Sequence, residues 1–210
     1  CLISGRIGNN CGDFISLGDN QLPGTAIPGL VECPATLNDT WGFKPGDHNW
    51  KSAHAVIGQL LELAEKRVNY LLNVGPRPDG QLPPETIRIL SEIAEWRKKN
   101  DDAFNGTEGN PFPQLFEDIR VLGGKGKIHF FFKTPGKESV IYGIQNEVIS
   151  ANVPFRQEGN ALMLDTSSLS GMWPRVILGI RGVPQINPVP TPLNGTLLLV
   201  PQMTDPDKPY

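Results

Sequence analysis

Apolar side chains recur with a helical period in two segments of the chain. In residues 51–68 they fall on one face at 3.6-residue spacing, and Ser52 stands where a hydroxyl group can cap the first turn. Pro83 and Pro84 begin the second segment, because proline fits the first turn of a helix. The pattern predicts that this second helix buries Ile87, Leu90, Ile93, Ala94 and Trp96.

Short apolar runs of strand length accompany these helices. Residues 2–4 are predicted to be the tail of a strand, residues 31–37 a buried strand, and residues 70–74 a further strand that a Gly-Pro step ends. The segment 5–27, rich in Gly, Asn, Asp and Pro, is expected to be a loop. Strands that alternate with helices favour parallel βα units, but so few units cannot close a barrel or complete a doubly wound sheet.

The pattern changes after about residue 105. A Gly- and Pro-containing linker at 108–113 is followed by short runs with strand character, separated by Gly, Pro and Asn turns, which predicts an antiparallel β-sandwich. These runs are 119–122, 127–133, 139–145, 161–165, 176–180 and 196–200. The predicted fold class is therefore α/β followed by all-β, with domains at 1–107 and 108–210.

Composition and charge narrow the class of protein. The chain has 210 residues, of which 39% are hydrophobic and 20% charged, and its formal net charge is −3, as in ordinary globular proteins. It has neither the basic stripe of a nucleic-acid-binding protein nor an apolar run that could span a bilayer, so no nucleic acid and no membrane are expected as partners. The oligomeric state is left open. A start at Cys1 instead of Met indicates a trimmed or truncated product.

The cysteines, Cys1, Cys11 and Cys33, do not indicate a metal or disulfide framework. Their odd number argues against a complete set of disulfides, and they lack the spacing of zinc ligands. Cys33 lies in an apolar stretch, so we predict a buried, inert thiol there and not a nucleophile.

Polar and aromatic residues gather where two predicted strands end. The run 38–43 follows one strand, and Asn73 lies near the end of the next. In α/β folds chemistry takes place beyond the carboxyl ends of the strands, so we expect a site there. Glu32 stands in an apolar stretch, where a buried carboxylate must be paired or catalytic. For Asp19, spacing alone favours the cap of a Gly-Asp-Asn turn over a catalytic acid.

Several short motifs, in a fixed order, resemble the α-L-fucosidases of glycoside hydrolase family 29 over roughly residues 3–107. The motifs are Ser4-Gly5-Arg6, Gly12-Asp13-Phe14, the run 38–43, Lys51-Ser52, the run 69–76, Pro78-Asp79-Gly80, Pro83-Pro84-Glu85, and the runs 95–100 and 103–107. The resemblance implies the C-terminal half of a (β/α)8-like barrel followed by a β-sandwich. It also implies hydrolysis of terminal α-L-fucose, with retention of configuration, from a fucosylated oligosaccharide or glycoconjugate.

Retention requires two carboxyl groups, a nucleophile and a general acid that later acts as base. The resemblance places the nucleophile on a strand upstream of everything matched here, outside this chain. It implies no cofactor and no metal, because carboxyl groups suffice for glycoside hydrolysis. A secreted, periplasmic or lysosome-like location is expected. The alternative interpretation is an inactive fragment or a carbohydrate-binding relative.

The resemblance assigns roles to particular side chains. Asp19 takes the place of the acid/base if one inserted residue is allowed, where many members have Glu; Glu32 is the alternative, and otherwise a supporting residue. Arg6 resembles an arginine that contacts the sugar near the reacting centre, and the alternative is an ordinary surface arginine without a functional role. Trp41 resembles an aromatic wall of the fucose pocket, with a core tryptophan as the alternative. Asn73 is expected to organise loops and not to touch substrate.

Overall fold

The chain folds into two compact units, Cys1–Asn105 and Gly106–Tyr210. The computed structural model describes residues 1–8, 11–187, 192–193 and 196–197. The predicted domain boundary, between residues 107 and 108, lies slightly further along the chain than the division between the units. Within the described ranges no helix is long and apolar enough to cross a membrane.

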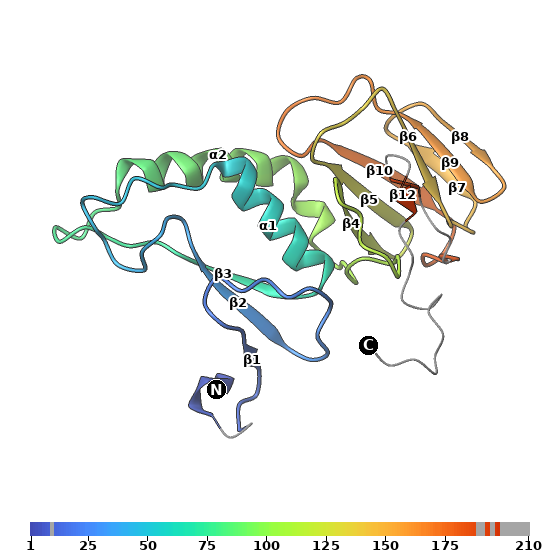
Figure 1. Cartoon of the computed structure of the whole chain (residues 1–210). Coiled ribbons are helices and arrows are strands. Elements are labelled where there is room, and N and C mark those ends of the chain that lie inside the picture. The colour runs from blue at the N-terminus through green and yellow to red at the C-terminus, as the bar shows by residue number, and fades with distance from the viewer. Residues whose placement is uncertain (9–10, 188–191, 194–195, 198–210) are drawn as a thin grey trace. The chain divides into compact units, whose positions relative to one another are not determined.

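A parallel sheet forms the centre of the first unit, as the alternation of strands and helices predicted. Strands β1 (Ile15–Ser16), β2 (Val31–Thr36) and β3 (Asn69–Asn73) pair in the order β1-β2-β3, with both pairs parallel. Parallel neighbours need crossover connections, and α1 (Ala53–Glu65) supplies the one between β2 and β3. Helix α2 (Pro84–Asn100) follows β3, and both helices lie on one side of the sheet (Figure 1).

Helix α1 confirms the first predicted helix, with shorter ends. Ser52 caps it, because its Oγ accepts a hydrogen bond from the amide of Ala55 at 3.2 Å. Leu63 of the helix packs with Val31 and Cys33 of β2 in a buried hydrophobic cluster. This cluster covers one face of the sheet.

Helix α2 begins after Pro83 as predicted, but its buried face only partly matches the one expected. The buried residues are Thr86, Ile89, Trp96 and Asn100. Ile87 was predicted to be buried and is 53% exposed, and Ala94 is also exposed. Trp96 is buried as predicted, and Leu90 and Ile93 are partly buried. The prediction was wrong for Ile87 and Ala94 because it followed apolar residues alone, whereas two polar residues lie inside. The Asn100 side chain tolerates burial because its Nδ2 donates to the carbonyl oxygen of Trp96 at 2.8 Å.

The N-terminal segment contains more structure than the predicted loop. Gly5–Ile7 form the 3-10 helix η1, and β1 lies inside the region expected to be irregular. The predicted strand tail is only an isolated parallel bridge between Ser4 and Phe14. β1 was missed because two residues are too short to show a strand pattern. A further 3-10 helix, η2 (Asp101–Ala103), follows α2.

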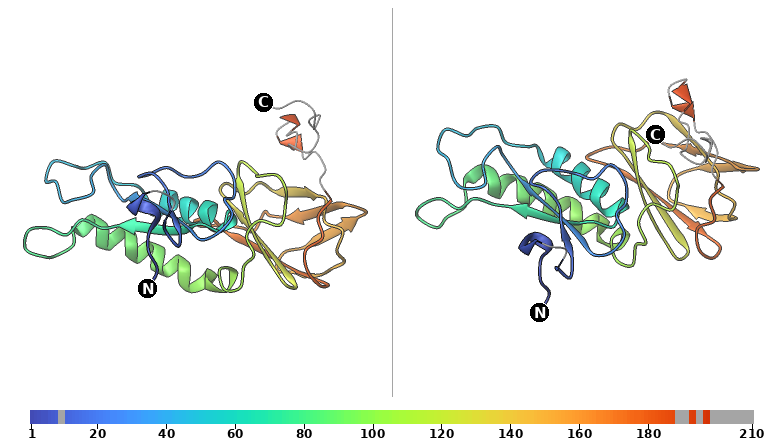
Figure 2. Two further views of the ribbon diagram at one scale, coloured as in Figure 1. Left: turned by 90° about the horizontal axis from the view of Figure 1, so that it is seen from below. Right: turned by 60° about the horizontal axis from the view of Figure 1, so that its bottom comes forward.

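The described part of the second unit consists of strands and loops (Figure 2). One antiparallel sheet has the order β4-β5-β10-β7, another has the order β6-β9-β8, and β11 pairs with β12. The strands are β4 (Ile119–Gly124), β5 (Lys127–Phe132), β6 (Glu138–Tyr142), β7 (Val148–Ala151), β8 (Phe155–Glu158), β9 (Ala161–Asp165), β10 (Arg175–Ile180), β11 (Pro192–Leu193) and β12 (Thr196–Leu197).

One hydrophobic core serves both larger sheets of this unit. Phe130 of β5, Val176 of β10 and Leu162 of β9 are fully buried in it. The predicted all-β character is confirmed, but β7, β8 and the two-residue β11 were missed. Strand β8 reads Phe-Arg-Gln-Glu and is largely exposed, so it lacks an apolar alternation. Of the last predicted strand, Thr196–Leu197 belong to β12, and 198–200 lie outside the described residues.

Candidate active site

A pocket of about 450 Å³ lies on the sheet of the first unit. Its lining residues are Arg6, Ser16, Asp19, Glu32, Pro34, Trp41 and Leu71. Because successive residues of a strand point to opposite faces, Glu32 and Pro34 share the pocket face of β2. Their neighbours Val31 and Cys33 point the other way, into the cluster under α1. The pocket therefore contains every side chain to which the resemblance gave a catalytic or substrate-binding role.

Sequence reasoning missed three of the lining residues, Ser16, Pro34 and Leu71. A signal existed for Pro34, since it stands two positions after Glu32 in a predicted strand. Ser16 and Leu71 reach the pocket through strand pairing, in which Ser16 lies opposite Glu32 and Leu71 opposite Pro34. No pattern along the chain specifies that register.

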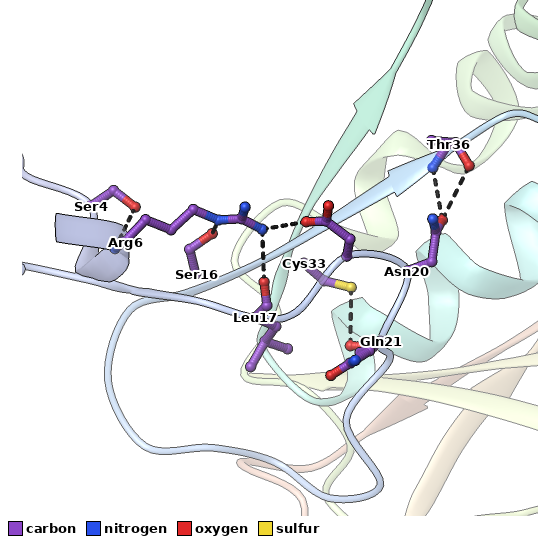
Figure 3. A network of polar contacts seen from close by, with 9 residues as sticks. Ser4, Arg6, Ser16, Leu17, Asn20, Gln21, Cys33 and Thr36 are labelled. Carbon is purple, nitrogen blue, oxygen red and sulfur yellow. Dashed lines mark hydrogen bonds and ion pairs between the residues drawn. The ribbon is translucent and has the colours of Figure 1, made fainter. Parts of the chain in front are cut away.

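Arg6 binds the start of the loop that carries Asp19. Its Nε donates to Ser16 Oγ at 2.9 Å, and its Nη2 donates to the carbonyl oxygen of Leu17 at 3.0 Å and to Asp19 Oδ1 at 2.6 Å (Figure 3). The guanidinium thus joins the end of β1 to the candidate acid/base. Both side chains remain about half exposed, at 52% for Arg6 and 49% for Asp19.

Glu32 occupies the same pocket with a different environment. It was expected to be buried, and therefore either paired or catalytic; the expected burial was wrong, because the residue is only partly buried. Among the described residues no side chain or amide bonds to its carboxylate. The pocket thus contains one carboxylate held by a guanidinium and a second without a partner from the described chain.

Trp41 lies on a loop that Asp47 holds together. One carboxylate oxygen of Asp47 accepts from the amide of Asp39 at 3.1 Å and from Thr40 Oγ1 at 2.8 Å, and the other accepts from the amide of Asn49 at 3.2 Å. Desolvation opposes ionisation of this carboxyl, but the hydrogen bonds outweigh it and lower the pKa of Asp47. The Trp41 ring, 39% exposed, is therefore presented from an ordered loop and is not a core side chain.

The end of β3 fixes the backbone at Trp41. Asn73 Nδ2 donates to the carbonyl oxygen of Trp41 at 2.7 Å, which confirms that Asn73 organises loops. A β-carbon on Gly75 would lie 3.1 Å from the Trp41 carbonyl oxygen, from Gly42 C and from Phe43 N. A side chain at this position would therefore require the neighbouring backbone to shift by a few tenths of an ångström.

Cys33 lies on the opposite face of β2, away from the pocket. Its side chain is fully buried, and its Sγ approaches the carbonyl oxygen of Gln21 at 3.5 Å. Burial, with a smaller effect from the charge of Glu62, raises the pKa of the Cys33 thiol. These observations support the predicted inert thiol.

Comparison with known proteins gives one consistent family. Residues 1–102 match the family model described as Alpha-L-fucosidase. Tissue alpha-L-fucosidase of Rattus norvegicus is 23% identical over an alignment of 210 positions, which covers 96% of this chain and 41% of the rat protein. Plasma alpha-L-fucosidase of Homo sapiens is 27% identical over 99 residues, 46% of this chain and 21% of that protein. The chain thus spans less than half the length of these relatives.

Solved structures show the same fold. The alpha-L-fucosidase from Vibrio sp. strain EJY3 aligns with a TM-score of 0.80 and 24% identity, covering 90% of this chain and 37% of that one. Alpha-L-fucosidase isoenzyme 1 from Paenibacillus thiaminolyticus aligns with a TM-score of 0.79 and 24% identity, covering 86% and 50%. Residues 1–102 of this chain are thus similar to the alpha-L-fucosidases, which are glycoside hydrolases, and the chain spans a part of their length.

Proposed function

We propose that this chain carries the acid/base half of the active site of a retaining exo-α-L-fucosidase, and that the nucleophile comes from outside this chain. The observation that carries the proposal is the convergence of Arg6, Asp19, Glu32 and Trp41 on one pocket, inside the segment that matches the family model. The substrate is terminal α-L-fucose of an oligosaccharide or glycoconjugate. A secreted, periplasmic or lysosome-like location is part of the same proposal.

In this proposal residues 1–107 are the C-terminal part of a (β/α)8-like barrel, and residues 108–210 are its attached β-sandwich. Three parallel strands with helices on one face support the first assignment. Two antiparallel sheets around one core support the second. Within the described residues β1 and β3 each pair on one side only, which leaves two edges where further barrel strands can add.

The reaction needs a carboxylic acid that protonates the leaving oxygen and then, as carboxylate, activates water. Asp19 lies on a loop that lines the pocket, its side chain is about half exposed, and it forms an ion pair with Arg6. Glu32 lies on the sheet, where it can bond to a sugar hydroxyl. The half-exposed ring of Trp41 offers an apolar surface to the fucose methyl group.

Hydrolysis of aryl α-L-fucosides tests the proposal, with this chain and with the longest protein in which the sequence occurs. Asp19→Asn should slow a substrate with a poor leaving group by about 10²–10⁴-fold, the usual contribution of general acid–base catalysis. It should slow the first step of an activated aryl fucoside far less, and azide should restore turnover of that substrate. Asp165→Asn, the same change at an exposed carboxylate of the second unit, is the matched control.

Two other results would change the assignment. If Glu32→Gln shows the leaving-group dependence and azide rescue, Glu32 is the acid/base and Asp19 is not. If no aryl fucoside is hydrolysed by either form, the enzyme proposal is wrong, and fucose binding measured by calorimetry then tests the carbohydrate-binding alternative.

A further inference from the structure

The residue after Asp19 is bound to the end of β2. The backbone amide of Asn20 donates to the carbonyl oxygen of Pro34 at 2.9 Å. The Asn20 side-chain Oδ1 accepts from the backbone amide of Thr36 at 2.9 Å (Figure 3). Asn20 has a φ of +57°, a conformation that asparagine adopts more readily than most residues. The turn that presents Asp19 is thus held by both the backbone and the side chain of its neighbour.

Thr36 links this turn to the loop that carries Trp41. Its hydroxyl has a single proton, and of its two nearby acceptors the carbonyl oxygen of Asn38 is closer than Asn20 Oδ1. The Thr36 hydroxyl therefore donates to the loop that carries Trp41, while the Thr36 backbone amide donates to Asn20. One residue at the end of β2 connects both walls of the pocket.

The ion pair between Arg6 and Asp19 cannot by itself fix the position of Asp19 in the pocket. Both side chains are about half exposed, and exposed ion pairs contribute little to holding a geometry. The position of Asp19 must then come from the backbone turn beneath it, and that turn is bonded to the sheet through Asn20.

We infer that Asn20 is a positioning residue, which fixes Asp19 against Arg6 and, through Thr36, sets this pair relative to Trp41. Its importance for hydrolysis rests on the proposed function, but its effect on geometry does not. Loss of the Asn20 side-chain oxygen leaves the Thr36 backbone amide without its acceptor and removes one of the bonds that hold the turn carrying Asp19.

Hydrogen exchange of the Arg6 Nε–H group, followed by NMR, measures this geometry in the intact chain without any substrate. Three substitutions separate the causes: Asn20→Gly keeps the positive φ without the amide, Asn20→Ala removes both advantages, and Asn20→Asp keeps an acceptor oxygen. Asn69→Ala is the matched control, because Asn69 Nδ2 of β3 donates to the carbonyl oxygen of Val31 at the other end of β2.

We expect exchange about tenfold faster in Asn20→Ala, the effect of losing one or two hydrogen bonds. The rise should be smaller in Asn20→Gly and absent in Asn20→Asp. With an aryl fucoside that has a poor leaving group, kcat should fall in the same order while KM changes little.

Unchanged exchange in Asn20→Ala and Asn20→Gly, or an equal rise in Asn69→Ala, would overturn the inference. If exchange follows the expected order but no fucoside is hydrolysed by the unsubstituted protein, the positioning role stands and the proposed function fails. The two failures are therefore distinguishable.

Discussion

Substitution of Gly75 by alanine should disturb the Trp41 loop more than the sheet. The added β-carbon would lie 3.1 Å from three backbone atoms, in Trp41, Gly42 and Phe43, and backbone cannot rotate away as a side chain can. Overpacking of this kind costs about 1–3 kcal/mol. Gly→Ala also removes freedom from the unfolded chain, which returns about 0.4–1 kcal/mol. The net loss in the free energy of unfolding should be about 0–2.6 kcal/mol.

Gly46→Ala isolates the contact, because a β-carbon on Gly46 meets nothing within 4 Å. The entropy gain is common to both variants, so their unfolding free energies in urea should differ by the overpacking cost, about 1–3 kcal/mol. In an active form of the protein, Gly75→Ala should raise KM for an aryl fucoside more than it lowers kcat, since it moves the aromatic wall. Unfolding free energies that agree within about 0.5 kcal/mol, the usual scatter of surface substitutions, would refute the reasoning.

Three further results follow from the same structure. The pKa of Asp47 is lower in the folded chain than its ordinary value of 3.8, so the unfolded chain binds more protons and stability falls as the pH drops from 3.8 through the folded pKa. In Asp47→Asn the urea midpoint should therefore fall less steeply over this acidic range, and an unchanged pH dependence would contradict the reasoning. Ile89→Ala should lower the free energy of unfolding in urea by about 2–5 kcal/mol, and Ile87→Ala by less than about 0.5 kcal/mol, because only Ile89 of the two is buried. Equal losses would show that Ile87 is buried, as its sequence pattern predicted. A thiol reagent such as DTNB should react with the two exposed cysteines of the native chain and with Cys33 only after unfolding, whereas rapid reaction of all three would show that Cys33 is accessible.

The elements of the first unit were predictable where local signals agreed. Ser52 and the 3.6-residue period identified α1, and the prolines identified the start of α2. The face of α2 was not predictable from apolar residues, because Ile87 is left outside while Thr86 and Asn100 lie inside. Which face of a helix is buried depends on the elements that pack against it, and the apolar period of the helix alone does not contain that information.

The candidate site was predictable only in part, and for a different reason. Asp19 could be singled out by resemblance, but its spacing favoured a turn cap, and the structure gives it an ion pair with Arg6. The bond between Asn20 and Thr36 joins residues sixteen positions apart, and no local pattern announces it. Contacts of this kind arise from strand register, so they become visible only when the sheet is assembled.

Pro34 stands in the central strand of the sheet, where proline removes a donor from the ladder. Up to that point β1 and β2 form regular parallel hydrogen bonds, and the Leu17 amide donates to the carbonyl oxygen of Glu32 at 3.0 Å. The next rung of a parallel ladder would run from the amide of residue 34 to the Leu17 carbonyl, and a proline nitrogen has no hydrogen for it. Arg6 occupies that oxygen instead. Pro34 thus ends the hydrogen-bond ladder between β1 and β2 where the pocket begins, and Arg6 is the donor that the Leu17 carbonyl oxygen receives there. An alanine at this position would bring a second donor, its backbone amide, to the same oxygen.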